Sequence, residues 1–450
     1  MYIAHDNSAH NEVPARRFQH IILEYQGGEK PVMHRIPSHS LQPTRTRFAA
    51  ALLLCAALAQ TAPAAAKKPR HGRGIRTQTG LDVLEAQKFA PLRGRHVGLI
   101  TNHTGVDAQG RSTIELLAKA PGVQLAAIFS PEHGIAGRAD EKVASSKDPA
   151  SGRPVYSLYG ETLRPTEEML KGIDALVFDI QDAGVRFYTY TTTMAYCMEE
   201  AAKHGIAFFV LDRPNPLGGE AIEGPMLDKD KTSFVGYFPL PVRYGLTIGE
   251  LARLVNEQNK IGCDLHVIAM RNWRRGAYHD NTGIRWIPPS PNLRTLKGAV
   301  LYPGLEILQS AGVSVGRGTE TPFELFGAPW MDGDRVAELL TARQLPGLSF
   351  HATQFLPASG LYHGQRCGGV SVRVNERSVA RAVRMGLEIA VVLKKLYPQH
   401  FEMRKILLLL GNEAALQKLG DGVPPEEIIR SGSAELAEFD SLRRKYFLYK

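Results

Sequence analysis

Acidic side chains that could take part in acid–base chemistry stand in short polar motifs of this 450-residue sequence. Glu132 lies between a proline and a His-Gly pair, and Asp179 and Asp182 share a second motif. Hydrolysis of a glycosidic bond needs a carboxylic acid to protonate the leaving oxygen and a second group to stabilise or attack the anomeric carbon. We predict Glu132 as the general acid and either Asp179 or Asp182 as the group that orients water or the sugar. Glu320 is a further candidate for the second carboxylate.

Aromatic residues follow the second acidic motif. Phe187, Tyr188 and Tyr190 offer ring faces against which a sugar could pack. The alternative interpretation of the same residues is structural. Phe187 could belong to the core, and Asp182 could cap a helix that begins near Thr189.

The elements that would position these residues are predicted from the hydrophobic pattern. Short continuous apolar runs, typical of strands covered on both faces, alternate with stretches of helical period. The predicted strands are 95–102, 123–130, 175–181, 206–212 and 265–270. The predicted helices are 111–120, 165–172, 191–204 and one beginning at Thr247, where Glu250 completes a capping-box pattern. This order predicts an α/β fold with a doubly wound parallel sheet.

The polar motifs directly follow predicted strands. Asn102 ends the first strand, the Glu132 motif follows the second, and the Asp179 motif follows the third. The fourth strand leads into another polar motif, in which Asp212 could pair structurally with Arg213. Because ligands of open parallel sheets bind beyond the carboxyl ends of the strands, we expect these motifs to converge on one site.

The domain organisation follows from shifts in composition. We predict an N-terminal extension with a signal peptide over 1–66, a basic linker over 67–79, a catalytic α/β domain over 80–284 and a second domain over 285–450. Past residue 285 the pattern is looser, and helices are expected again near 334–342, 378–396, 402–419 and 434–446.

The net charge of +9 is concentrated at the N-terminus. Residues 1–76 carry eleven Lys and Arg against four acidic residues, which leaves only +2 for the rest of the chain. Nucleic-acid binding needs a clustered basic surface on the folded part, so we predict no nucleic-acid partner.

The N-terminal charges belong to an export signal. Arg45 and Arg47 precede an unbroken apolar run over 48–59, and small residues follow up to Ala66, the expected cleavage site. The run is shorter than the roughly 20 residues of a membrane span. With Met33 as the start, the signal peptide would cover 33–66, so we expect a secreted, periplasmic protein. The alternatives are a buried helix over the same residues and lipidation of Cys55.

Several other site types are not supported by the sequence. The stretch 102–107 after the first strand lacks the Gly-x-Gly-x-x-Gly fingerprint of dinucleotide binding, and no Walker loop is present. Glu132, His133 and His103 show no spacing typical of a metal site. Ser314 lies in a Gly-x-Ser-x-Gly match, but a loop rather than a helix follows it. We predict no metal and no cofactor.

The motifs together resemble a known family, the exo-acting β-N-acetylmuramidases of bacterial peptidoglycan turnover, long catalogued as a domain of unknown function. The resemblance covers nearly all of the chain from about residue 80. It rests on GLITN (98–102), SPEHG (130–134), DIQD (179–182), GVRFYTY (184–190), DRPNP (212–216), SVGRGT (314–319), PFE (322–324) and CGGV (367–370).

This resemblance implies a Rossmann-like N-terminal domain and a smaller α+β C-terminal domain with the substrate cleft between them. The family's proposed catalytic glutamate falls on Glu132. The implied reaction releases terminal N-acetylmuramic acid from the non-reducing end of peptidoglycan fragments. The 2-acetamido group of the substrate could itself act as nucleophile. The segment 309–312 departs from the family pattern, which puts its role in substrate binding in doubt.

N-acetylmuramic acid carries a lactyl carboxylate, which an arginine fork would bind in a bidentate manner. The candidates are Arg186, Arg213 and Arg317, which lie in matching motifs. The residues predicted to bind substrate are Asn102, His133, Arg186, Tyr188, Tyr190, Arg213, Asn215, Arg317 and Glu320.

Two alternative functions remain open at the level of sequence. The same aromatic and arginine residues would suit a non-catalytic muropeptide-binding protein. A serine esterase or amidase using Ser314 is the third interpretation. The expected partners in the leading interpretation are peptidoglycan-derived muropeptides, with no stable membrane insertion after cleavage of the signal. Spacing along the chain does not determine whether the reaction retains or inverts the anomeric configuration.

Overall fold

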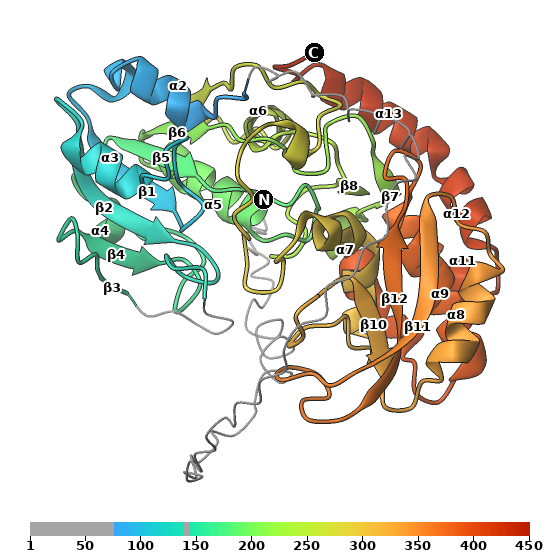
Figure 1. Ribbon diagram of the computed structural model, residues 1–450. Helices are drawn as coiled ribbons and strands as arrows, with labels where there is room; N and C mark the ends of the chain where they lie inside the picture. Colours follow the sequence, from blue (N-terminus) through green and yellow to red (C-terminus); the bar gives the residue numbers. More distant parts are fainter. Residues whose placement is uncertain (1–75, 139–144) are drawn as a thin grey trace, which may run out of the picture. The chain divides into compact units, whose positions relative to one another are not determined.

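The computed structural model describes residues 76–138 and 145–450 (Figure 1). The predicted signal peptide and most of the basic linker therefore lie outside the described residues. None of the helices in the described ranges combines the length and the hydropathy that a membrane span requires.

The N-terminal half is built on a seven-stranded sheet with the strand order β3-β4-β2-β1-β5-β6-β9. Its strands are β1 (His96–Thr101), β2 (Gln124–Ser130), β3 (Ser146–Lys147), β4 (Pro154–Ser157), β5 (Ala175–Asp179), β6 (Ala207–Leu211) and β9 (Leu265–Ile268). All neighbours pair in parallel except β3 and β4. The five predicted strands are confirmed as β1, β2, β5, β6 and β9, and the predicted α/β fold is confirmed with them.

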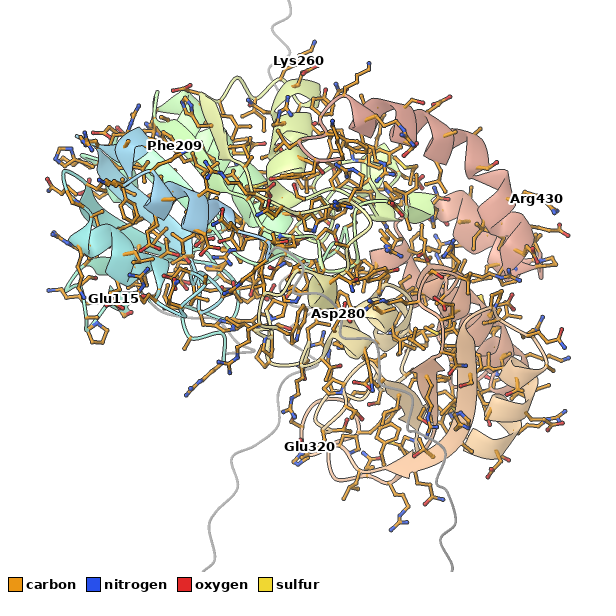
Figure 2. All side chains as sticks on the ribbon, turned by 45° about the horizontal axis from the view of Figure 1, so that its top comes forward. Glu115, Phe209, Lys260, Asp280, Glu320 and Arg430 are labelled. Carbon is orange, nitrogen blue, oxygen red and sulfur yellow. The ribbon has the colours of Figure 1, made fainter. Side chains whose placement is uncertain are left out.

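Helices cover both faces of this sheet (Figures 1 and 2). They are α2 (Gly80–Ala86), α3 (Thr113–Lys119), α4 (Glu167–Leu170), α5 (Tyr190–Lys203) and α6 (Ile248–Gln258), with short 3-10 helices η1 (Ala90–Leu92), η2 (Lys229–Lys231) and η3 (His279–Asn281). Along β1, Val97 and Leu99 pack with α2 and α3, whereas Ile100 packs on the side of α4, α5 and α6. Side chains that alternate between two cores explain why the strand sequences are apolar throughout.

The predicted capping box at the start of α6 is confirmed. The Thr247 side chain accepts a hydrogen bond from the Glu250 amide, and the Glu250 carboxylate accepts one from the Thr247 amide at 3.0 Å. Two amides that would have no partner inside the helix are thereby satisfied.

The C-terminal half contains the antiparallel sheet β10-β12-β11 and a set of helices. The strands are β10 (Leu325–Ala328), β11 (Leu348–Phe355) and β12 (Cys367–Val374), and a separate two-stranded ribbon pairs β7 (Glu223–Met226) with β8 (Pro241–Arg243). The helices are α7 (Leu296–Gln309), α8 (Gly333–Thr341), α9 (Ala382–Leu396), η4 (Met403–Ile406), α10 (Leu407–Leu410), α11 (Glu413–Gly420), α12 (Pro425–Ser431) and α13 (Ser433–Arg444).

Helix α7 was not predicted, because Pro303 and two glycines interrupt its pattern. Burial explains why the segment is nevertheless helical, since most of its second half is inaccessible to solvent. Gly304 lets α7 approach α9 closely: a Cβ at this position would lie 1.9 Å from the carbonyl oxygen of Ala382. The glycine that weakens the helix locally is thus needed for the packing of two helices.

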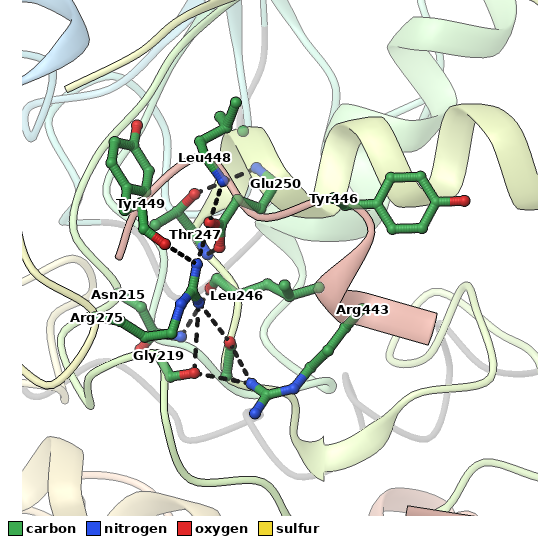
Figure 3. A network of polar contacts seen from close by, with 12 residues as sticks. Asn215, Gly219, Leu246, Thr247, Glu250, Arg275, Arg443, Tyr446, Leu448 and Tyr449 are labelled. Atoms are coloured by element: carbon green, nitrogen blue, oxygen red, sulfur yellow. Dashed lines mark hydrogen bonds and ion pairs between the residues drawn. The ribbon is translucent and has the colours of Figure 1, made fainter. Parts of the chain in front are cut away.

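The last residues of the chain return to the N-terminal half (Figure 3). Tyr449 donates a hydrogen bond from its hydroxyl to Asp212 at 2.5 Å, and the Leu448 amide donates to Glu250 at 2.9 Å. Arg443 donates to the carbonyls of Gly219 and Gly245 at 2.8 and 2.6 Å. The C-terminus therefore helps to hold the loops that follow β6 and β8.

Candidate active site

Glu132 stands in a tight turn directly after β2. The Gly134 amide donates to the Pro131 carbonyl at 3.1 Å, and both His133 and Gly134 adopt positive φ angles, of 69° and 71°. A left-handed conformation at a non-glycine residue costs on the order of 1–3 kcal/mol and is common where function requires it. This turn leaves Glu132 half-buried at the carboxyl end of the sheet.

The hydroxyl of Thr189 holds the Glu132 carboxylate. Oγ1 of Thr189 donates to Oε2 of Glu132 at 2.5 Å. Thr189 is the N-cap residue of α5, yet its side chain makes no capping bond to that helix. The carboxylate therefore lies at the positive end of a 14-residue helix, where a negative charge is stabilised.

Tyrosines from both halves of the chain lie around Glu132. The rings of Tyr188 and Tyr190 meet edge to face with centroids 4.9 Å apart, and Tyr302 of α7 lies 6.0 Å from Tyr188. Burial raises the pKa of all three hydroxyls, and the nearby charge of Glu132 contributes to the rise in each. The sequence prediction that Tyr188 and Tyr190 lie with Glu132 agrees with this arrangement, whereas Tyr302 was not predicted.

Asn102 and the histidines complete this end of the sheet. Asn102 donates to the Tyr190 hydroxyl at 3.1 Å, and that hydroxyl donates to the Pro289 carbonyl at 2.7 Å. Nε2 of His103 lies 2.7 Å from the Pro288 carbonyl and so carries the proton. Burial lowers the pKa of His103, and the neighbouring charge of His133 lowers it further.

Asp182 is buried next to this group. Its Oδ2 accepts hydrogen bonds from the Gly184 amide at 2.7 Å and from the Tyr244 hydroxyl, while Oδ1 has no hydrogen-bond partner among the described residues. Burial raises the pKa of Asp182 to about 6, although hydrogen bonds from Tyr244 and from the Gly184 and Ala183 amides favour the charged form. Asp182 does not cap α5, so the structural alternative considered for it is wrong.

Asp179 and Arg213 bind each other. Nε and Nη2 of Arg213 lie 2.5 and 2.9 Å from the two carboxylate oxygens of Asp179, and the Thr113 hydroxyl also donates to this carboxylate. Asp179 is fully buried and Arg213 is 4% exposed. The two charges thus balance each other inside the protein. Arg213 pairs with Asp179 and not with Asp212, which was the structural alternative considered from the sequence.

Arg186 and Asn215 are also engaged in internal contacts. The Arg186 guanidinium donates to the carbonyls of Pro225, Leu240, Leu409 and Leu410 at 2.7 to 3.1 Å. Burial lowers its pKa to about 9, so it stays charged at neutral pH.

Asn215 donates to the Leu246 carbonyl at 2.8 Å and accepts from the Leu217 amide at 3.0 Å. Its amide therefore braces the loop that follows β6. Arg186 and Asn215 therefore use these donors within the protein, and none of these hydrogen bonds is made to Glu132.

Arg317 is the least enclosed of the three candidate arginines. Its side chain is 28% exposed and its Nη2 lies 2.6 Å from Oε1 of Glu306 on α7. The charges of Glu306, Arg317 and Glu132 all act on Tyr302, which places the ion pair near the same tyrosine. Glu306 was not predicted, although it is the only charged residue in the apolar stretch 298–308.

Glu320 and Ser314 lie apart from this arrangement. The Glu320 side chain is 96% exposed and lies 3.4 Å from Arg294 on the surface (Figure 2). Ser314 is buried in an extended bridge with Gly327, and its Oγ accepts from the Gly316 amide at 3.3 Å. The strand-to-helix turn that a nucleophilic serine requires is not formed there. Within the described residues, no three His, Cys, Asp or Glu side chains come together as a metal site.

The chain was compared with known proteins. It matches two protein-family models, described as exo-β-N-acetylmuramidase NamZ, N-terminal, over residues 97–297, and exo-β-N-acetylmuramidase NamZ, C-terminal, over residues 300–449. The peptidoglycan β-N-acetylmuramidase NamZ of Bacillus subtilis (strain 168) is 43% identical over 389 residues, which cover 85% of this chain and 92% of that protein.

Two solved structures of DUF1343 family proteins from Bacteroides fragilis NCTC 9343 have a similar fold. The first is 38% identical with a TM-score of 0.78, and the second is 29% identical with a TM-score of 0.70. Both alignments cover 84% of this chain, and they cover 100% and 99% of the solved chains.

Proposed function

We propose a reaction for this chain from the family to which it belongs, the exo-β-N-acetylmuramidases: it is a glycoside hydrolase that releases terminal N-acetylmuramic acid from the non-reducing end of peptidoglycan fragments. The observation that carries this proposal is the match to both family models along almost the whole described chain. The protein is therefore an enzyme that hydrolyses peptidoglycan fragments.

Glu132 is the proposed general acid. Its Oε2 is held by Thr189, so Oε1 is the oxygen available to give a proton to the glycosidic oxygen as the bond from that oxygen to C1 breaks. Water then adds to C1, and its proton returns to Glu132 where the 2-acetamido group has attacked C1, or passes to the second carboxylate where that group activates the water. The tyrosines around Glu132 are buried, 0% exposed for Tyr190 and 6% for Tyr188 and Tyr302, so they pack beside it and do not present a free ring face to a sugar.

The second catalytic group is proposed from the remaining carboxylates and the substrate. Asp179 is neutralised by Arg213, which leaves it poorly suited to attack C1 or to activate water. Asp182 is buried, but one of its carboxylate oxygens has no hydrogen-bond partner among the described residues, which makes it the better candidate among the protein groups. The 2-acetamido group of the substrate could take the same role, and this would relieve the protein of supplying a nucleophile.

Arg317 is the proposed receptor for the lactyl carboxylate. Arg186 and Arg213 are buried with their guanidinium groups bound inside the protein, whereas the Arg317 side chain is 28% exposed beside Glu306. A planar guanidinium can bind a second carboxylate in a bidentate manner. This contact would distinguish N-acetylmuramic acid from N-acetylglucosamine, which lacks the lactyl group.

Export is proposed on the N-terminal sequence. The apolar run 48–59 and the small residues before Lys67 support a signal peptide over 33–66 and a periplasmic location. N-terminal sequencing of the exported protein would begin at Lys67 under this proposal, and an uncleaved N-terminus would contradict it.

The function is tested by product analysis on two matched glycans, one ending in N-acetylmuramic acid and the other in N-acetylglucosamine at the non-reducing end. We expect the wild-type enzyme to release the free terminal sugar from the first glycan only. Release of internal fragments would contradict exo-action. Tight binding of the first glycan without any product would instead support a muropeptide-binding protein.

A further inference from the structure

The hydroxyl of Thr189 has an unusual position for an N-cap residue. N-cap threonines normally accept a hydrogen bond from an amide in the first turn of their helix. Thr189 precedes α5 with helical backbone angles, φ −66° and ψ −16°, and its side chain makes no such bond. The hydroxyl instead donates to Oε2 of Glu132, 57 residues earlier in the sequence.

This contact is the hydrogen bond by which the described part of the protein holds the Glu132 carboxyl group. It spans 2.5 Å between Oγ1 and Oε2, and no second bond from the described residues reaches Oε1. A protonated carboxyl group accepts hydrogen bonds chiefly through its carbonyl oxygen, while its other oxygen carries the proton. The donor on Oε2 thus places the acidic proton on Oε1.

We propose that Thr189 is a positioning residue for catalysis: its hydroxyl orients the Glu132 carboxyl group and directs the proton to Oε1, the oxygen that faces the scissile bond. This inference rests on the proposed function, in which Glu132 is the general acid. Thr189 itself does not touch the substrate in this account, and it acts only through Glu132.

Helix α5 provides a matched control. Thr193, one turn further along the helix, is fully buried, and its hydroxyl has no hydrogen-bond partner among the described residues. Thr189→Val and Thr193→Val each replace a hydroxyl with a methyl group of similar size. Since neither hydroxyl caps the helix, we expect both variants to keep the melting temperature within about 2 °C of wild type.

The experiment measures kcat/KM for the release of N-acetylmuramic acid. A hydrogen bond to a charged or acidic group contributes enough that its loss corresponds to about a 10- to 100-fold change. We expect this loss in Thr189→Val, carried by kcat, and near wild-type activity in Thr189→Ser and in Thr193→Val. The loss in Thr189→Val should become smaller with an activated aryl leaving group, because such a group needs less protonation.

Each outcome has a clear meaning. Equal activity of Thr189→Val and wild type would overturn the positioning role while leaving the proposed function intact. A loss that is the same for poor and activated leaving groups, or that serine does not rescue, would also overturn it. An inactive wild-type enzyme would instead count against the proposed function.

Discussion

At the scale of single residues, the three candidate arginines differ in what they bind. Arg213 is paired with a buried aspartate and Arg186 with four backbone carbonyls, so their charges are used to hold the fold. Arg317 pairs with Glu306, and its side chain is 28% exposed. Removing either of the first two would leave buried groups unpaired. Removing Arg317 also takes a partner from the buried Glu306, so recognition is tested by comparing substrates.

Arg317→Ala should change the preference of the enzyme for a substrate with a free lactyl carboxylate. We expect kcat/KM to fall about 10- to 100-fold on a substrate with a free lactyl carboxylate, because a bidentate charged contact is lost. On the same substrate with the carboxylate converted to an amide, we expect a change below about 3-fold. Arg335→Ala, which removes an exposed arginine paired with Glu338, is the control and should affect neither rate. Equal losses on the acid and the amide would exclude Arg317 as the receptor.

Asp182 should make stability depend on pH. Burial raises its folded-state pKa to about 6 from 3.8, so the folded protein binds this proton more tightly than the unfolded chain. The resulting stabilisation is fully present below the unfolded pKa and is lost as the pH rises through about 6.

Asp182→Asn removes this titration. In urea unfolding experiments from about pH 4 to about pH 7, we expect the fall in the free energy of unfolding to be smaller in the variant by roughly 2 kcal/mol. The comparison is between slopes, so a uniform offset from the altered contact with Tyr244 does not affect it. Identical slopes in the two proteins would show that Asp182 does not titrate in this way.

At the scale of elements, the parallel sheet could be predicted because the amino-acid pattern of its strands reflects their burial on both faces. Runs such as 175–181 are apolar on both faces, and this pattern arises only where helices cover both sides of a sheet. The Thr247–Glu250 capping box was predictable for a similar reason, since both partners lie within one helical turn.

Other elements have local sequences that do not indicate their structure. Pro303 and Gly304 argue against a helix, and α7 forms because its surroundings bury it. In the C-terminal sheet, Gly327 faces Gly369 across β10 and β12, so side chains that would signal a strand are absent. Tertiary packing decides the structure at these positions.

Most residues of the candidate site could be named from the sequence motifs, but their hydrogen-bond and ion-pair partners could not. The sequence places Glu132, Tyr188 and Tyr190 after strands of one sheet, and these residues do lie together. The carbonyls that bind Arg186 are up to 224 residues away, and no spacing indicates such a partner. For the same reason Glu306, which belongs to an apolar helix, was missed.

At the scale of the whole molecule, the two halves share a hydrophobic core. One cluster of buried side chains includes Phe178 of the parallel sheet, Tyr188, Tyr302 of α7 and Val370 of the antiparallel sheet. The C-terminal residues add polar contacts to the N-terminal half: Arg443 donates to the Gly219 carbonyl, and the Tyr449 carbonyl accepts from Arg275 (Figure 3). Glu132 and Arg317, which come from different halves, are therefore connected through packed side chains.

The central claim is that this muramidase uses Glu132 as its general acid. It is tested most directly by comparing wild type and Glu132→Gln on a glycan that ends in N-acetylmuramic acid at the non-reducing end. Glutamine keeps an oxygen that can accept from Thr189, but it has no acidic proton to give. We expect the release of N-acetylmuramic acid to fall about 10²- to 10⁴-fold with an unchanged unfolding transition. Release at close to the wild-type rate by the folded variant would contradict the claim.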